Sequence, residues 1–187
     1  MIYRPIVIDE EIKFSKKKFI VSKTDIKGNI TFINKNFTEV SGYSEAELMG
    51  EPHNILRHPD MPRAVFYLVW QNLLAGRPIS GVIKNLAKDG RYYWVIADLE
   101  AKLNSDGSIN SLTAFRRAAP QNVIDATEEL YASLLAIEKK HGMEKSLVYL
   151  LGFLEEEELS YDEFISELIK PKGIIAILLE AFKKMIG

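Results

Sequence analysis

Three side chains that could bind a charged ligand stand almost together at Arg57, His58 and Asp60. They precede a segment in which Phe66 and Trp70 are four residues apart, the spacing of one helix face. The unpaired N–H groups at a helix start favour an anionic or polar group. A charged rim beside an aromatic wall suits a ligand with a polar or phosphate end and a flat ring. The same block also fits a surface ion pair that caps a core helix, so it leaves both interpretations open.

The composition excludes several classes of function. The chain has 187 residues, of which 47% are hydrophobic and 27% charged, with a net charge of −2, typical of one soluble domain with or without an extension. No basic stripe indicates nucleic-acid binding. The absence of cysteine excludes thiolate metal sites, iron–sulfur clusters and flavin–cysteine adducts. No catalytic triad order, phosphate-binding loop or metal-ligand cluster appears, so we expect neither an enzyme nor a metal site.

The distribution of apolar residues predicts a cytoplasmic location. The first residues lack the apolar segment of a signal peptide, and no apolar run is long enough to span a bilayer. Membrane association would then require a partner receptor.

The first part of the chain alternates short strands and short helices. Residues 18–23 and 30–33 read as a hairpin, and Ser44 with Glu47 forms a capping-box pattern. A longer helix is predicted over residues 61–76, with Asp60 as its N-cap. Three further strands are predicted over residues 81–87, 92–103 and 110–117, joined by Asp-Gly pairs that favour hairpin turns. This order predicts an α+β fold with one antiparallel sheet and helices on a single face.

The last third of the chain has helical patterns. Helices are predicted over residues 126–140 and 147–154, then after a capping box at Ser160, and finally over residues 174–186. Packing against one another is the simplest role for these helices. Docking of a partner and formation of a homodimer are the alternatives.

Residues 19–118 resemble PAS sensor domains, and more narrowly the FAD-binding PAS domain of bacterial aerotaxis and energy-taxis receptors. The matching features, in chain order, are Asp25 to Ile30, Asn34, Asn36-Phe37, Ser41 to Ser44, Glu47-Leu48, Gly50, Pro52 to Asn54, Arg57 to Pro62, Trp70, Gly76 to Pro78, Gly81, Lys84-Asn85, Asp89-Gly90 and Tyr93 to Val95. The resemblance implies a five-stranded antiparallel PAS fold over residues 19–118. An N-terminal cap over residues 1–18 and a helical region over residues 121–187 would flank it.

The resemblance also implies a noncovalent FAD held between the sheet and the short helices. The residues it assigns to cofactor binding are Asn34, His53, Arg57, His58, Asp60, Phe66, Trp70, Asn85 and Trp94. The chemistry of these side chains suits such roles. Arg57 can pair with a diphosphate, Trp70 can stack on a ring, and Asn85 offers both a donor and an acceptor.

The function implied is a cytoplasmic redox or energy sensor that signals to a separate chemotaxis-type signal transducer, with the C-terminal helices as a candidate docking element. Two alternatives stay open. One is a cofactor-free PAS interaction module, which Ile79 favours because an aromatic residue is usual there. The other is a haem sensor with His53 or His58 as axial ligand.

Overall fold

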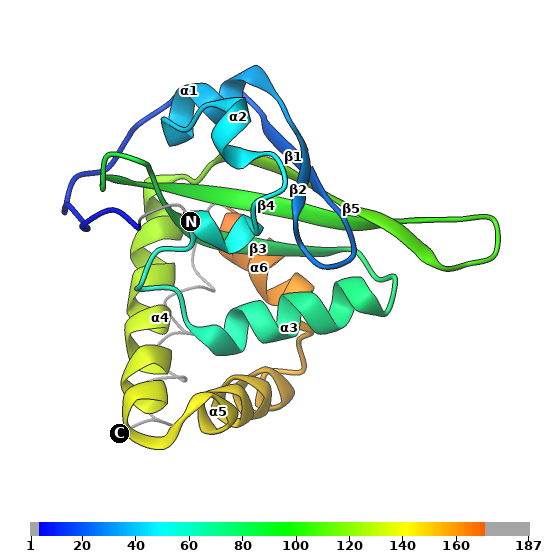
Figure 1. The fold of residues 1–187 in the computed structure, drawn as a ribbon. Coiled ribbons are helices and arrows are strands. Elements are labelled where there is room, and N and C mark those ends of the chain that lie inside the picture. Colours follow the sequence, from blue (N-terminus) through cyan, green and yellow to red (C-terminus); the bar gives the residue numbers. More distant parts are fainter. Residues whose placement is uncertain (1–3, 171–187) are drawn as a thin grey trace.

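The computed structural model describes residues 4–170 of the chain. The elements are β1 Ile20–Thr24, β2 Ile30–Ile33, α1 Lys35–Ser41, α2 Glu45–Leu48, the 3-10 helix η1 His53–Leu56, α3 Arg63–Leu74, β3 Ile79–Leu86, β4 Tyr92–Leu103, β5 Ile109–Ala118, α4 Gln121–His141, α5 Met143–Glu156 and α6 Tyr161–Ile169 (Figure 1). The helix predicted over residues 174–186 lies outside the described residues.

The five strands form one antiparallel sheet in the order β2-β1-β5-β4-β3, so the predicted α+β class and sheet are confirmed. The N-terminal segment adds to this sheet beside the start of β4, beyond the end of β5. There Ile12 N donates to Tyr92 O at 2.7 Å, and Tyr92 N donates to Glu10 O at 3.0 Å. Gly90 permits the close approach of this segment, because a Cβ at Gly90 would lie 2.1 Å from Ile6 O.

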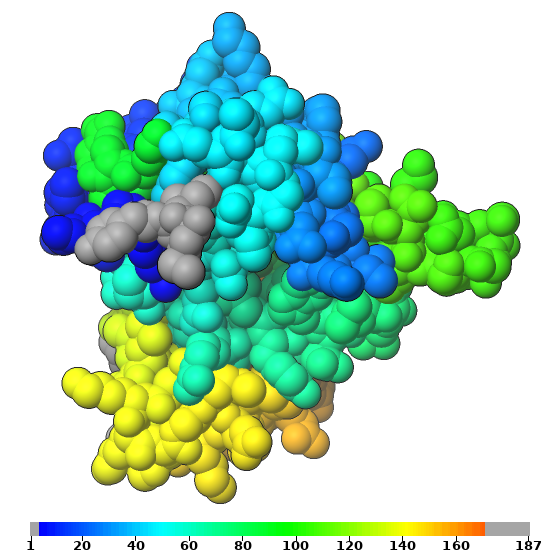
Figure 2. Space-filling view, in the orientation of Figure 1, coloured from blue at the N-terminus to red at the C-terminus, as the bar shows by residue number. Residues whose placement is uncertain are grey.

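The helices before β3 and those after β5 cover different parts of the sheet (Figure 1). Helix α3 lies across one face, whereas Tyr131 of α4 packs its ring against Trp94 on the other, with ring centroids 6.3 Å apart. Helix α5 packs against both α4 and α3, and α6 packs against β3. Buried residues of both parts belong to one hydrophobic core. Figure 2 shows α5 directly beside α3, with the β4–β5 hairpin projecting away from the rest of the molecule.

Strand β3 is an edge strand, and two of its outward backbone groups are paired by residues of the helical region. Asp162 of α6 accepts a hydrogen bond from Ser80 N at 2.8 Å, and the Tyr131 hydroxyl donates to Val82 O at 2.6 Å. The helical region therefore closes an edge that would otherwise offer unpaired groups to another strand.

The N-terminus of α3 is capped from a distant part of the sequence. The predicted N-cap, Asp60, is wrong, because the helix begins at Arg63 and its N-cap residue Pro62 has no side chain that accepts a hydrogen bond. Instead, Glu138 of α4 accepts from Ala64 N at 2.8 Å, and its side chain is only 7% exposed. A carboxylate at this position also interacts favourably with the helix dipole.

Replacing Glu138 should weaken the attachment of α3 to the helical region. We expect Glu138→Ala to lower the free energy of unfolding by ~1–2 kcal/mol, the usual cost of losing an N-cap acceptor, and Glu138→Gln to cost less. Urea unfolding followed by circular dichroism measures both. Glu156→Ala, a change at an exposed position, is the control. An equal loss in Glu138→Ala and Glu156→Ala would contradict the capping role.

Candidate functional site

A cavity of about 480 Å³ lies between the sheet, η1 and α3, within the size range of small-molecule sites. Strands β1, β3, β4 and β5 contribute residues to its lining. Its lining consists of Ser22, Thr24, Lys27, Gly28, Pro52, His53, Asn54, Arg57, Arg63, Phe66, Tyr67, Val69, Trp70, Leu73, Ile83, Asn85, Leu99, Leu112, Thr113, Ala114, Arg116 and Met143.

Helix α3 supplies the apolar wall of the cavity. Phe66, Val69, Trp70 and Leu73 recur at helical spacing, so one face of α3 lines the cavity. The Trp70 ring lies over the turn between β1 and β2, where a Cβ at Gly28 would come within 3.1 Å of Trp70 Cζ2. A glycine is also favoured there by its φ of 85°. The wall thus has a flat aromatic surface held close to the backbone of a turn.

Arg57 lies at the edge of this wall. It follows η1, its guanidinium lies 5.0 Å from the centre of the Phe66 ring, and its Nη2 donates to Met61 O at 2.7 Å. These contacts hold the planar group in place at the lining of the cavity. The structure therefore brings Arg57, Phe66 and Trp70 together, as the spacing of the sequence predicts.

Asn85 offers the cavity a free amide. It lies on β3, is 4% exposed and lines the cavity, and its side chain makes no hydrogen bond to any of residues 4–170. An amide on the wall of a cavity can pair with a ligand that both donates and accepts.

Arg116 and its neighbours are functional candidates that the sequence did not indicate. Arg116 lies on β5, the central strand, and is 4% exposed. Its Nη1 donates to Ser22 Oγ at 2.9 Å, and its Nη2 lies 3.0 Å from His53 Nε2. Since the guanidinium can only donate, His53 Nε2 is the acceptor. Burial and then the nearby Arg116 charge lower the pKa of His53 to about 3, so this imidazole is neutral at pH 7.

The cavity is strongly cationic. Its lining contains Lys27, Arg57, Arg63 and Arg116, whereas neither Asp nor Glu occurs among the described lining residues. Positive charge focused in a cavity attracts anionic ligands. Arg63 is partly compensated, because its Nε lies 3.5 Å from Glu138 Oε2.

His58 and Asp60 lie apart from the cavity, although they follow Arg57 closely in the sequence. Asp60 N donates to His58 Nδ1 at 3.1 Å, and Asp60 Oδ2 pairs with Lys84 Nζ at 2.8 Å. The Lys84 ammonium lies over the Tyr92 ring, 4.2 Å from its centre. Lys84 and Asn85 are neighbours on β3, and successive strand residues face opposite sides. The two groups of polar residues are thereby separated.

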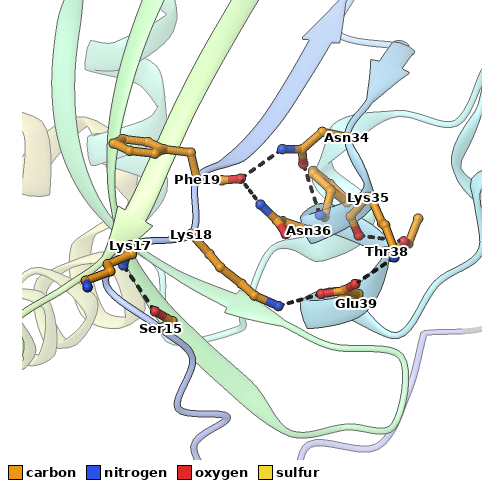
Figure 3. Close-up of polar contacts among 10 residues, drawn as sticks. Ser15, Lys17, Lys18, Phe19, Asn34, Lys35, Asn36, Thr38 and Glu39 are labelled. Atoms are coloured by element: carbon orange, nitrogen blue, oxygen red, sulfur yellow. Dashed lines mark hydrogen bonds and ion pairs between the residues drawn. The ribbon is translucent and has the colours of Figure 1, made fainter.

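Asn34 and Trp94 also lie outside the cavity lining. Asn34 caps α1, because its Oδ1 accepts from Phe37 N at 3.1 Å, and its Nδ2 donates to Phe19 O at 2.8 Å (Figure 3). It ties α1 to the start of β1. Trp94 packs on the opposite face of the sheet, against Tyr131. The cofactor roles that the resemblance implies for Asn34, His58, Asp60 and Trp94 therefore have no support in this arrangement.

Ile79 does not weaken the cavity wall. It is buried beneath α6, in a separate groove that it shares with Leu68 and Tyr161. An aromatic residue at this position would meet the helical region. The departure from the family pattern thus falls where this chain packs its C-terminal helices.

Residues 30–116 match a family model described as the PAS fold. This match and the five-stranded sheet place the chain among the proteins that carry a PAS domain. The chain is 38% identical over 150 residues to the aerotaxis receptor of Escherichia coli (strain K12), which is 80% of this chain and 29% of that receptor. It is 35% identical over 97 residues to the nitrogen fixation regulatory protein of Klebsiella pneumoniae, 52% of this chain and 20% of that protein.

The chain thus spans less than a third of the length of these two relatives. A solved light-oxygen-voltage domain studied with a flavin analogue has a TM-score of 0.52 and 21% identity, over 58% of this chain and 82% of that chain. At this identity the likeness shows the fold alone. No helix among residues 4–170 is long and apolar enough to cross a membrane.

Gly28→Ala should displace the Trp70 ring. The left-handed φ alone costs ~1–2 kcal/mol, and Gly107→Ala has the same penalty, because Gly107 has a φ of 83° and open space around it. We expect the backbone strain to lower the free energy of unfolding of both variants by a similar amount. Only Gly28→Ala should shift the tryptophan emission. Unchanged emission in Gly28→Ala would show that Trp70 is not held against this turn.

His53 should make the fold sensitive to acid. Its pKa is lowered from 6.5 to about 3 by folding, so the unfolded chain binds more protons between these values. Stability from this residue is complete above pH 6.5 and falls as the pH drops toward 3. NMR should show that the His53 ring resonances stay constant from pH 7 to 5. A midpoint near 6.5 would contradict the burial of this imidazole beside Arg116.

Proposed function

We propose that this PAS domain binds FAD noncovalently in the cavity and reports the redox state of the flavin to a separate signal transducer. The observation that carries the proposal is the unpaired Asn85 amide, which lies in a cationic cavity with a flat aromatic wall. A flavin when bound supplies reversible two-electron chemistry, a polar ring edge and anionic phosphates. The residues present fit each of these three parts.

The chain's own residues would divide the binding between ring and phosphates. The Trp70 ring can stack on a flat ring, and the Asn85 amide can donate to and accept from its polar edge. Arg57 and the exposed Lys27 lie where a hydrated diphosphate can be paired. Binding is noncovalent in this proposal, because the chain has no cysteine to form a thiol adduct.

The route of the signal follows from shared contacts. Helix α3 forms the wall of the cavity, receives its N-terminal cap from Glu138 of α4, and packs against α5. A change in hydrogen bonding or charge in the cavity that moves α3 would therefore change the contacts of α3 with the helical region. The relatives named as an aerotaxis receptor and a regulatory protein support a signalling role. We propose that the helical region contacts the transducer, with energy taxis as the response and a cytoplasmic location.

The two alternatives receive less support. In a cofactor-free module, side chains would fill the cavity and pair Asn85, and neither is the case among the described residues. For haem, His53 Nε2 is the acceptor of an Arg116 donor, which competes with a metal. His58 is 2% exposed and lies outside the cavity, against Tyr92.

Trp70→Ala and Arg57→Ala should reduce FAD retention while leaving the fold intact. Each removes a side chain that lines the cavity, and we expect the affinity for FAD to fall roughly tenfold or more. The visible spectrum of the purified protein and the cofactor released on heating measure occupancy. Trp94→Phe, on the far face of the sheet, is the control and should keep its FAD.

Three outcomes would decide against this assignment. Full occupancy in both cavity variants would remove Trp70 and Arg57 from the site. A Soret band would favour haem. A colourless protein that cannot be reconstituted with FAD would favour the cofactor-free module.

A further inference from the structure

Arg116 is a buried cation without a counter-charge. Among residues 4–170 its guanidinium forms no ion pair, and its hydrogen-bond partners are the Ser22 hydroxyl and the neutral His53 ring. Burial lowers the pKa of Arg116 to about 10, so it remains charged at pH 7. The nearest titratable group on β4 is Tyr93, whose pKa burial raises. No described group facing Arg116 supplies a negative charge at neutral pH.

A buried, uncompensated charge is costly, and a ligand that supplies a negative charge relieves that cost. Two parts of a flavin nucleotide could do so, the phosphates or the ring. Arg63 and Lys27 are exposed, whereas Arg116 is 4% exposed on the central strand. Phosphates are strongly hydrated and suit the exposed cations. The position of Arg116 therefore points to the ring.

We propose that Arg116 selects the anionic form of the reduced flavin ring and thereby sets the redox response of this domain. The inference rests on the proposed function. In the two-electron reduction beside Arg116, the oxidised ring takes up two electrons and one proton and becomes a monoanion. Without the cation, the reduced ring would keep a second proton up to a higher pH, so that in mildly acidic solution it would take up two electrons and two protons and become neutral. His53 and Ser22 position the guanidinium.

The proton count is measurable as the pH dependence of the midpoint potential. One proton per two electrons gives a decrease of ~30 mV for each tenfold fall in proton concentration, and two protons give about twice that slope. We expect the flavin-loaded wild-type chain, reduced stepwise beside a reference dye of known potential between pH 5 and 6.5, to show the smaller slope. Arg116→Gln should show the larger slope and a lower midpoint potential at pH 7. Arg116→Lys should restore the smaller slope, because it keeps the charge.

Arg117→Gln is the matched control. Arg117 is the next residue of β5, faces the opposite side of the sheet and pairs with Asp98, with Nη1 and Oδ2 2.6 Å apart. Its replacement should leave the slope unchanged. The larger slope in the wild-type chain would overturn the inference, as would the smaller slope in Arg116→Gln.

Reconstitution separates the remaining possibilities. If Arg116 bound the phosphates, Arg116→Gln would lose affinity for FAD but not for riboflavin, and the inference would be overturned. If Arg116→Gln retains neither, the wild-type and Arg116→Lys slopes still decide the matter. Failure of the wild-type chain to bind any flavin would defeat the proposed function itself, and this outcome differs from a bound flavin with the larger slope.

Discussion

The pairing of the outer edge of β3 joins the sheet to the helices that follow it. This strand ends the sheet, so one row of its backbone groups has no strand to bind. Asp162 and Tyr131, from two helices that follow the sheet, pair two of these groups at Ser80 and Val82. The helical region is consequently attached to the PAS domain by directional hydrogen bonds as well as by apolar packing. An independent helical domain on a linker would leave these two groups unpaired, while Lys84 O would still accept from His58 N.

The cavity depends on a second constraint, which is the cost of buried polar groups. Asn85 and Arg116 project from strands of the same sheet, and neither side chain pairs with a described carboxylate. Such groups are tolerated in a fold when hydrogen bonds or ion pairs to a ligand or to neighbouring residues offset the free-energy cost of their burial. Here Ser22 and His53 hold Arg116 in one orientation, whereas the Asn85 amide has no described partner. The guanidinium of Arg116 is therefore fixed in orientation, whereas the amide of Asn85 is free to pair with a ligand.

Local signals in the sequence predicted most of the elements. The Asp-Gly turns and the capping boxes at Ser44 and Ser160 depend on residues within a few positions of one another, and the structure has them. The cap of α3 could not be predicted in this way, because Glu138 is 74 residues from Ala64. The local candidate, Asp60, pairs instead with a lysine on a strand.

The candidate site was predictable where its residues share one helix face and less so where they lie on strands or turns. Phe66 and Trp70 are four residues apart on α3, so their common direction follows from helix geometry. Arg116 and Arg117 are adjacent, and alternation guarantees that they face opposite sides. The sequence does not say which side carries the cavity. The β5 pattern of small and polar residues around Arg116 was the available signal, but it reads equally well as an exposed face.

The same alternation on β3 places neighbouring residues at the cavity and at helix α4. Asn85 lines the cavity, while Lys84 lies on the other side between Asp60 and Glu128, with Nζ 2.8 Å and 3.9 Å from their carboxylate oxygens. Two adjacent residues of one strand thus contact the cavity and the first helix after the sheet, α4. Because a strand moves as a unit, a displacement of β3 that improves the contacts of Asn85 also changes the ion pairs of Lys84. In the proposed signalling, β3 would thus offer a second short connection between the cavity and the helical region, beside the one through α3.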